Sequence, residues 1–306
     1  MKYRGTTIAD VSCECTDVHI ARMLLTAISE SVALAEASYL CGWSIITAAP
    51  IQGCVEGTAS PDRTPDGRPG VWIQMNAPTP LGLAAFVDAL LDRLCLLPHL
   101  PTCSLFDATP TGQSIRSINV ADRVAKWGDG YESREKLDRR EIVRLPIMTG
   151  DQLIERELGV CMGTDGVLEV FGENATCCVA AAREAAQRVV ADAPGVAVFN
   201  YPVGGISGAK VGGLVYREEG VTINEPFCPS LRAHPDVRSQ VPDAAGATIE
   251  FPLVAVSEEA VREGLRVAIN AFCSTPGVVA ITAPSFGGQW GDRHLPLKDL
   301  IGGSGM

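Results

Sequence analysis

The sequence predicts an α+β protein with two split βαβ lobes and inserted loops. Strand-like runs alternate with amphipathic helices in both halves, and the second half contains an internal repeat. In each copy a helix is followed by Pro-Gly-Val, a short strand, a second proline and a Gly-Gly pair. The two prolines are eight residues apart in both copies, Pro194 to Pro202 and Pro276 to Pro284. Helices packed on one face of a sheet in this order form the ferredoxin-like arrangement.

The first lobe is predicted from residues 8–106, with the order strand, helix, strand, strand, helix, strand. Apolar residues at three- and four-residue steps over 83–94 predict a helix, with Thr79 as its cap and Pro80 at its first position. Alternation over 71–76 predicts a half-buried strand. A helix is also expected over 20–28.

Two helices, near 175–192 and 257–273, are predicted for the second lobe. The lobes are expected to meet near Gly150, which gives an N-terminal lobe over 1–150, a C-terminal lobe over 151–300 and a flexible tail over 301–306. The charged, turn-rich stretch 119–151 is interpreted as an excursion or linker at the boundary. A second irregular insert is expected over 218–246.

Composition excludes several classes of function. The 306 residues, 46% of them hydrophobic, suffice for the cores of two domains. A net charge of -11 argues against a nucleic-acid or anionic-membrane surface, because both need a cationic face. Charged residues interrupt every long apolar run, and no leader pattern opens the chain, so a cytosolic protein without membrane spans is expected.

The 11 cysteines and four histidines form no metal-binding pattern. There is no Cys-x-x-Cys, and the odd cysteine count disfavours a closed disulfide framework. Most cysteines are therefore interpreted as small buried side chains in a reducing compartment, with one redox or metal cysteine as the alternative. No metal site is predicted.

The loop Thr64-Pro65-Asp66-Gly67-Arg68-Pro69-Gly70 has two interpretations. Pro-Asp-Gly is a common turn signal, so the loop can simply be a stiff connection into the following strand. A rigid loop also loses little entropy when it holds a ligand, so Arg68 can clamp an anionic group.

Glycine-rich stretches 204–210 and 285–288 follow strand ends, where backbone amides can meet a ligand. Neither has the spacing of a phosphate-binding loop, and Ser207 is not in Gly-x-Ser-x-Gly. A plain turn is the alternative for each stretch.

Glu250 stands inside the strand-like run 247–254. Simple solvent exposure is the ordinary interpretation of one charged residue on an alternating strand. The functional alternative is a carboxyl in a cleft wall, whose pKa burial raises so that it donates a proton or hydrogen bond.

Ordered blocks along nearly the whole chain resemble the formylmethanofuran:tetrahydromethanopterin formyltransferases of methanogens and their bacterial counterparts. The blocks lie at 64–70, 90–93, 101–102, 106–108, 128–131, 210–212, 228–229, 276–279 and 286–288. The chain departs from the family pattern in its many cysteines, in a Trp before Gly128 where Phe is expected, and in one residue fewer between Pro202 and Lys210.

The resemblance implies two ferredoxin-like lobes, a homotetramer, and direct formyl transfer without metal or tightly bound cofactor. Tetrahydromethanopterin and methanofuran would be carrier substrates, and Glu250 would correspond to the glutamate that assists the reaction. In bacteria the similar protein joins an amidohydrolase-type subunit in a formyltransferase/hydrolase complex. Substrate-binding residues are expected at Asp66, Gly67, Arg68, Gly204, Gly205, Lys210, Phe286, Gly287 and Gly288.

Within this resemblance, Arg68 and Lys210 are expected to hold anionic tails, and Phe286 with its neighbouring glycines to pack against a pterin or furan ring. Two alternatives remain open. One is a non-catalytic scaffold paralogue within the complex, and the other is a small-ligand sensor, because fold alone does not decide function.

Overall fold

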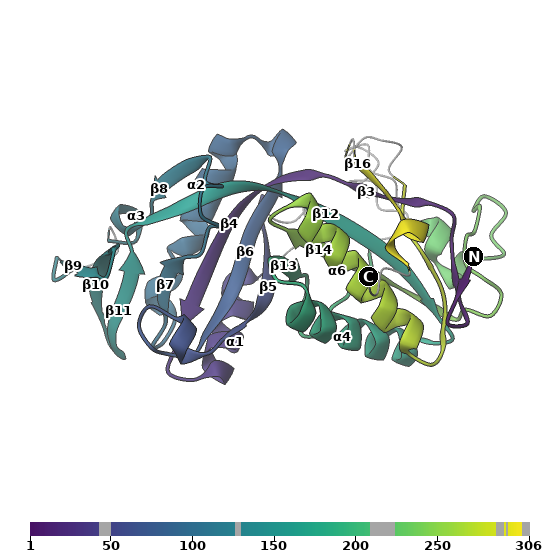
Figure 1. The fold of residues 1–306 in the computed structure, drawn as a ribbon, viewed down its shortest axis with the longest axis horizontal. Helices are drawn as coiled ribbons and strands as arrows, with labels where there is room; N and C mark the ends of the chain where they lie inside the picture. Colours follow the sequence, from purple (N-terminus) through teal and green to yellow (C-terminus); the bar gives the residue numbers. More distant parts are fainter. Residues whose placement is uncertain (43–49, 126–129, 209–223, 286–290, 292, 302–306) are drawn as a thin grey trace, which may run out of the picture. The chain divides into compact units, whose positions relative to one another are not determined.

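The chain forms two compact units in the computed structural model (Figure 1). The structure describes residues 1–42, 50–125, 130–208, 224–285, 291 and 293–301. The first unit is Val18–Gly163, and the second unit combines Met1–Asp17 with Thr164–Met306. Both units contain helices and sheet, as expected for an α+β protein. The lobe boundary at residue 150 stays a prediction.

The first unit has the predicted order strand, helix, strand, strand, helix, strand. Its strands lie in the order β5-β6-β4-β7, and each neighbouring pair is antiparallel. In chain order the elements are β4 (Asp17–Thr26), α1 (Glu30–Cys41), β5 (Gln52–Ala59), β6 (Gly70–Pro78), α2 (Leu83–Leu94) and β7 (Ser104–Asp107).

The helix expected over 20–28 is wrong, because these residues belong to strand β4 and to the turn after it. Met23, Leu24 and Leu25 are all buried, so both faces of β4 are covered. A strand buried on both faces loses its alternation and cannot be told from a buried helix by periodicity. The helix is α1, which begins after Ser29, whose hydroxyl accepts a hydrogen bond from the backbone N–H of Val32.

The apolar stripe of α2 is confirmed, but its predicted start is wrong. Phe86, Val87, Leu90 and Leu94 are buried, as their spacing indicates. The predicted cap region instead forms a separate 3₁₀ turn, η2 (Thr79–Leu81). Gly82 then takes φ 85°, a conformation that interrupts helical backbone, and α2 begins at the next residue.

Most of the stretch 119–151 extends the first unit's sheet and is not a linker. It contains α3 (Ala121–Ala125), β9 (Ser133–Leu137) and β10 (Arg140–Ile147), and it leads into β11 (Gly150–Glu155). β10 pairs with both β9 and β11 in antiparallel register, and β11 pairs with β7. Trp127, Gly128 and Asp129 lie outside the described residues.

The second unit repeats the element order of the first. Its four main strands lie in the order β13-β14-β12-β15, with antiparallel neighbours. Both predicted helices are confirmed, and each begins after a polar cap, Asn174 or Ser257. The elements are β12 (Glu157–Gly172), α4 (Ala175–Asp192), β13 (Val196–Val198), β14 (Ala247–Ala255), α6 (Glu258–Ser274) and β15 (Val278–Thr282).

Short elements complete the two units. β2 forms an antiparallel pair with β1 and a parallel pair with β15. β3 pairs with β16, and β8 pairs with the first residues of β12. The strands are β1 (Lys2–Tyr3), β2 (Thr6–Ile8), β3 (Ser12–Cys15), β8 (Arg116–Asn119) and β16 (Arg293–Pro296), and the remaining 3₁₀ turns are η1 (Pro61–Arg63), η3 (Leu97–His99), η4 (Glu225–Phe227), η5 (Pro229–Leu231) and η6 (Leu297–Leu300).

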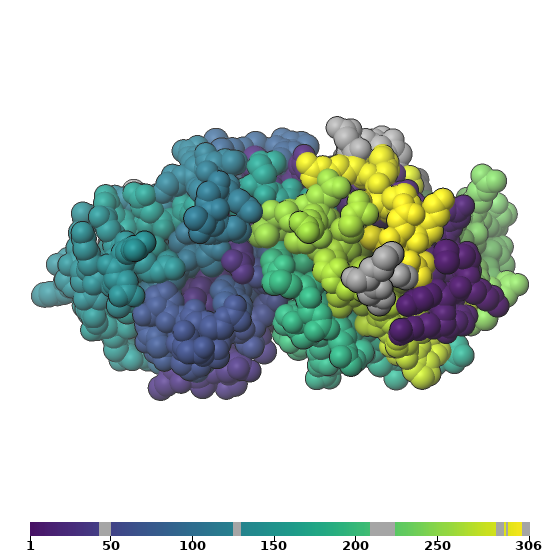
Figure 2. Space-filling model, viewed as in Figure 1, coloured from purple at the N-terminus to yellow at the C-terminus, as the bar shows by residue number. Residues whose placement is uncertain are grey.

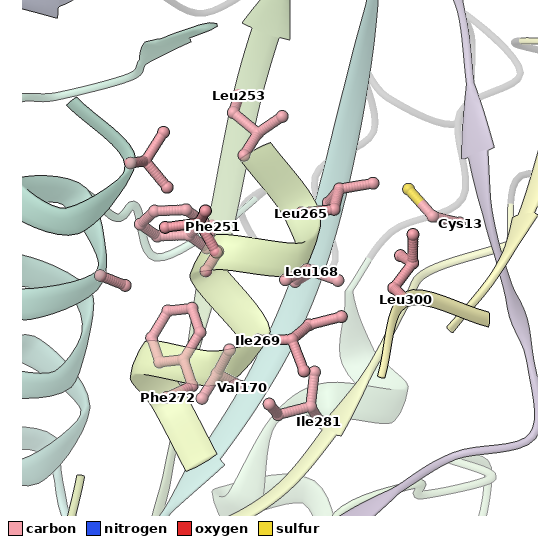
Figure 3. Close-up of a cluster of buried hydrophobic side chains, with 14 of the residues drawn as sticks. Cys13, Leu168, Val170, Phe251, Leu253, Leu265, Ile269, Phe272, Ile281 and Leu300 are labelled. Carbon is pink, nitrogen blue, oxygen red and sulfur yellow. The ribbon is translucent and has the colours of Figure 1, made fainter. Parts of the chain in front are cut away.

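The main core of the second unit lies between its sheet and the helices α4 and α6 (Figure 3). Leu168 of β12 and Phe251 of β14 point toward these helices, and Phe251 packs edge-on against Phe272 with ring centroids 5.1 Å apart. Figure 2 shows α4 and α6 at the surface of this unit, covering the sheet in that view. One face of the sheet is thereby closed by helices.

Most cysteines are buried, which confirms the interpretation made from the sequence. All eleven are free thiols, and the eight buried ones are Cys13, Cys15, Cys41, Cys54, Cys103, Cys161, Cys178 and Cys273. Burial raises the pKa of the Cys41 thiol to about 12, so this thiol stays protonated and behaves as a small apolar group.

Candidate active site

Two glutamates lie opposite one another on neighbouring strands of the second unit. Glu250 of β14 is the register partner of Glu169 of β12, and Thr282 of β15 lies opposite Glu169 on its other side. Side chains alternate between the two faces of a strand. Because Leu168 and Phe251 belong to the core beneath α4 and α6, the two glutamates are on the face away from these helices.

Glu250 is held by its backbone and by one side-chain donor. Its backbone N–H and C=O bond to the C=O and N–H of Ile206 at 3.0 and 2.9 Å. The Asn224 side-chain amide donates to the Glu250 Oε2 at 3.0 Å. The side chain is partly buried, and this burial raises its pKa to about 7, although the hydrogen bond from Asn224 opposes the shift.

Glu169 is more deeply buried than Glu250, with only 2% of its surface exposed. Its Oε1 atom has no hydrogen-bond partner among the described residues. Burial raises the pKa of Glu169 well above its ordinary value, and the nearby charge of Glu250 raises it further. A buried acid with an unpaired oxygen is costly, so its presence calls for a functional explanation.

An apolar cluster adjoins the glutamate pair. Phe171 follows Glu169 by two residues on the same face of β12, and its ring lies 6.3 Å from that of Phe227. The Thr248 hydroxyl donates to the Phe227 backbone carbonyl at 2.7 Å. Val241, Ala245 and Ala280 complete the cluster.

The geometry suits acid–base work and oxyanion stabilisation. A carboxyl whose pKa lies near 7 exchanges a proton readily at neutral pH. In its neutral form it also donates a hydrogen bond to an oxygen that gains negative charge. Glu250 therefore has the burial and the raised pKa that the functional interpretation of its sequence position required, whereas the cleft wall and the catalytic role stay predictions.

Gly204 and Gly205 lie in the same unit as Glu250 and are explained by close packing. A Cβ on Gly204 would stand 2.4 Å from the Cβ of Ala186, and one on Gly205 would stand 2.6 Å from Cδ1 of Ile249. Gly204 also has φ +79°. Their role in substrate binding stays a prediction. Lys210, Phe286, Gly287 and Gly288 lie outside the described residues.

Arg68 stabilises its own loop in the first unit. Its guanidinium donates to the Asp66 carboxylate at 2.8 Å, to the Thr102 carbonyl at 2.5 Å and to the Ser104 hydroxyl at 2.6 Å. It also donates to the Thr26 hydroxyl at 3.0 Å. Gly67 has φ +68° in this turn. These contacts fit the stiff-connection interpretation, and the ligand role of Asp66, Gly67 and Arg68 stays a prediction.

Glu169 and Asn224 were not predicted from the sequence, and Gly208 was predicted only as part of the glycine-rich stretch 204–210. Glu169 had a signal, because it is a lone carboxylate in the apolar run Val167–Phe171. Asn224 had none, since it stands in an irregular insert. Gly208 has φ +73°, and a Cβ there would stand 2.3 Å from the Asn224 amide nitrogen and 2.5 Å from the Glu250 Oε2. Gly208 thus lets both side chains meet.

Replacing Gly208 by Ala is expected to lower turnover by roughly tenfold, because the new methyl group separates Asn224 from Glu250. The left-handed backbone adds a stability cost of about 1–2 kcal/mol. Gly112→Ala is the matched control, since Gly112 has φ +77° but nothing within 4 Å of its Cβ position. Both variants should lose similar stability in thermal unfolding, and only Gly208→Ala should lose turnover. Equal turnover in the two variants would contradict the assignment.

Comparison with known proteins identifies the family. Residues 1–147 match the family model for formylmethanofuran-tetrahydromethanopterin formyltransferase, and residues 150–300 match the model for its proximal lobe. The chain belongs to this family. The resemblance stated from the sequence is thereby confirmed.

Relatives of full length support the assignment to the formyltransferase family. The enzymes named formylmethanofuran–tetrahydromethanopterin formyltransferase from Methanosarcina barkeri and Methanopyrus kandleri are 32% and 33% identical to this chain, and each alignment covers 98% of this chain and all of the relative. The solved structure of the Methanosarcina barkeri enzyme has a TM-score of 0.88 at 30% identity, with 98% and 100% coverage.

A second solved structure is a formyltransferase/hydrolase complex. It comes from Methylorubrum extorquens and holds methylofuran. One of its chains is 26% identical to this chain, with a TM-score of 0.85 and 99% coverage of both. Among the described residues, no helix combines the length and apolar character needed to cross a membrane.

Proposed function

We propose that this protein transfers a formyl group directly between N5 of a tetrahydromethanopterin and the amine of methanofuran or a methanofuran analogue. Full-length similarity to enzymes named for this reaction supports the substrates. The observation that carries the chemistry is Glu250, a partly buried carboxyl on the sheet face away from α4 and α6, whose pKa is raised to about 7.

The reaction needs an acid and an orienting site, and it needs no nucleophile from the protein. The accepting nitrogen attacks the formyl carbon, a C–N bond forms, and the carbonyl electrons move onto oxygen. Neutral Glu250 donates a hydrogen bond to this oxyanion. The oxyanion then collapses, the bond to the departing nitrogen breaks, and that nitrogen gains the proton that the accepting nitrogen loses. In general, orientation of two reactants in one site can lower a barrier by roughly 7–11 kcal/mol.

Each unit is proposed to be a ferredoxin-like lobe. The chain order strand, helix, strand, strand, helix, strand combines in both units with an antiparallel sheet in which the first and third strands are central. In the first unit these central strands are β4 and β6, and in the second unit they are β12 and β14. This is the order of a split βαβ fold.

We also propose an assembly and a set of ligands for this chain. We infer a cytosolic homotetramer that binds its two carriers as substrates and holds no tightly bound cofactor. Similarity to a chain of the Methylorubrum extorquens formyltransferase/hydrolase complex favours assembly with an amidohydrolase-type subunit. The predicted ligand residues are Asp66, Gly67, Arg68, Gly204, Gly205, Lys210, Phe286, Gly287 and Gly288.

An assay of the purified full-length chain tests the proposed function. The chain is incubated with formyl-tetrahydromethanopterin and methanofuran, and formylmethanofuran is measured by chromatography, alone and after reconstitution with the hydrolase subunits. We expect formylmethanofuran in both cases. Product in neither case would overturn the proposed transfer and favour a scaffold role.

A further inference from the structure

We propose that Glu169 is a positioning residue that shares one proton with Glu250, so that the pair carries one proton before and after the formyl group moves. The proposal rests on the proposed function of Glu250 and adds a second carboxyl to it. Glu169 acts through Glu250, because only 2% of its own surface is exposed.

The sheet register brings the two carboxyls together. Glu169 and Glu250 are direct partners on the antiparallel strands β12 and β14. Residues opposed in this way have Cβ atoms about 4.5–5.5 Å apart, which is within reach for two glutamate side chains on the same face. The Glu169 Oε1 has no hydrogen-bond partner among the described residues, so its bonding capacity is available to Glu250.

The surroundings of the pair provide no neutralising charge within the part of the chain that the structure describes. Thr282 faces Glu169 from β15, and Asn224 donates to Glu250 from the segment that precedes η4. Glu250 is the charged group that acts on Glu169. Two neighbouring buried carboxyls cannot both ionise without a cation, so the pair retains one proton at pH values where a single carboxyl would lose it.

Asn224 determines which oxygen carries the proton. Its amide N–H donates to the Glu250 Oε2, which therefore acts as an acceptor. The Glu250 Oε1 is left to exchange a proton with Glu169 or with the substrate. During transfer Oε1 gives its proton to the departing nitrogen, and the pair regains one proton from the accepting nitrogen. The number of protons on the pair is the same before and after the reaction.

The test compares the pH dependence of kcat/KM for the wild-type chain, Glu169→Gln and Glu169→Asp. Glu169→Gln cannot share a proton, so Glu250 should lose its proton near pH 7, the pKa that burial and the opposing hydrogen bond from Asn224 give it. For each protein, kcat/KM is scaled to its own maximum. The alkaline fall of kcat/KM should occur at least one pH unit lower in Glu169→Gln than in the wild type. At a given alkaline pH the scaled kcat/KM values should therefore differ about tenfold. Glu169→Asp keeps an acid and should restore the alkaline limb.

Infrared difference spectroscopy of the carboxylic acid C=O band gives a readout that does not depend on turnover. We expect an acid band in the wild type at pH 8 that Glu169→Gln lacks, and Glu184→Gln, an exposed site on α4, should keep it. Identical pH profiles for wild type and Glu169→Gln, or no acid band in the wild type at pH 8, would overturn the proposal. If the wild-type chain lacks turnover, the proposed function fails, and the infrared result still decides whether the proton is shared.

Discussion

Glu250→Gln is expected to reduce kcat for formyl transfer by roughly 100-fold or more. The side chains have nearly the same shape, and the Gln carbonyl can still accept the hydrogen bond from Asn224. Gln cannot supply a proton, however, and its amide is a weaker donor to an oxyanion than a neutral carboxylic acid. Because this interaction forms in the transition state, kcat and kcat/KM should fall together, whereas KM should change little.

Stability provides the control for the Glu250→Gln variant. The folded pKa of Glu250, about 7, is above the ordinary value of 4.5, so ionisation of this group costs folding free energy. That cost is absent below pH 4.5, grows as the pH rises, and is complete above pH 7. Glu250→Gln removes it and should be more stable than wild type at pH 8, by about 3 kcal/mol. Unchanged turnover in a folded Glu250→Gln variant would exclude Glu250 from the mechanism.

Glu250 could be predicted from the sequence, but its partners could not. A lone carboxylate in a strand-like run is visible in one sequence, and both Glu169 and Glu250 show it. Their pairing depends on the register between β12 and β14, which are far apart in the chain. Asn224 depends on the path of an irregular insert, and such a path has no periodic signal. The sequence therefore indicates single residues, whereas the pair arises only from the folded sheet.

The same distinction explains which elements of the fold were predicted. Helices α4 and α6 have an apolar stripe and a polar cap, so local chemistry and tertiary packing agree. β4 is buried on both faces, so its apolar run has no alternation and has the pattern of a buried helix. Only its pairing with neighbouring strands identifies it as a strand. The hydrogen-bond partners of Arg68 could not be predicted from the sequence either, because Thr102 and Ser104 are far from Arg68 in the chain.

Glu56→Ala is expected to destabilise the protein by about 3–5 kcal/mol, because it leaves the partly buried Arg22 guanidinium without its ion-pair partner. The Glu56 side chain is 5% exposed and accepts two hydrogen bonds from the Arg22 guanidinium, at 2.7 and 2.5 Å. It also accepts one from the Gln74 amide at 2.9 Å. Urea unfolding followed by circular dichroism measures the change.

Two further variants separate ion pairing from the loss of side-chain volume. Arg22→Met with Glu56→Leu removes both charges and keeps apolar bulk, so it should recover most of the stability that Glu56→Ala loses. Glu184→Ala breaks the exposed pair between Glu184 and Arg188 and should cost no more than about 0.5 kcal/mol. If Glu56→Ala costs no more than Glu184→Ala, the buried network does not stabilise the first unit. The large expected difference between these two ion pairs follows from desolvation, since water reaches the partly buried Arg22 guanidinium less readily than the exposed Arg188 and replaces its lost partner less well.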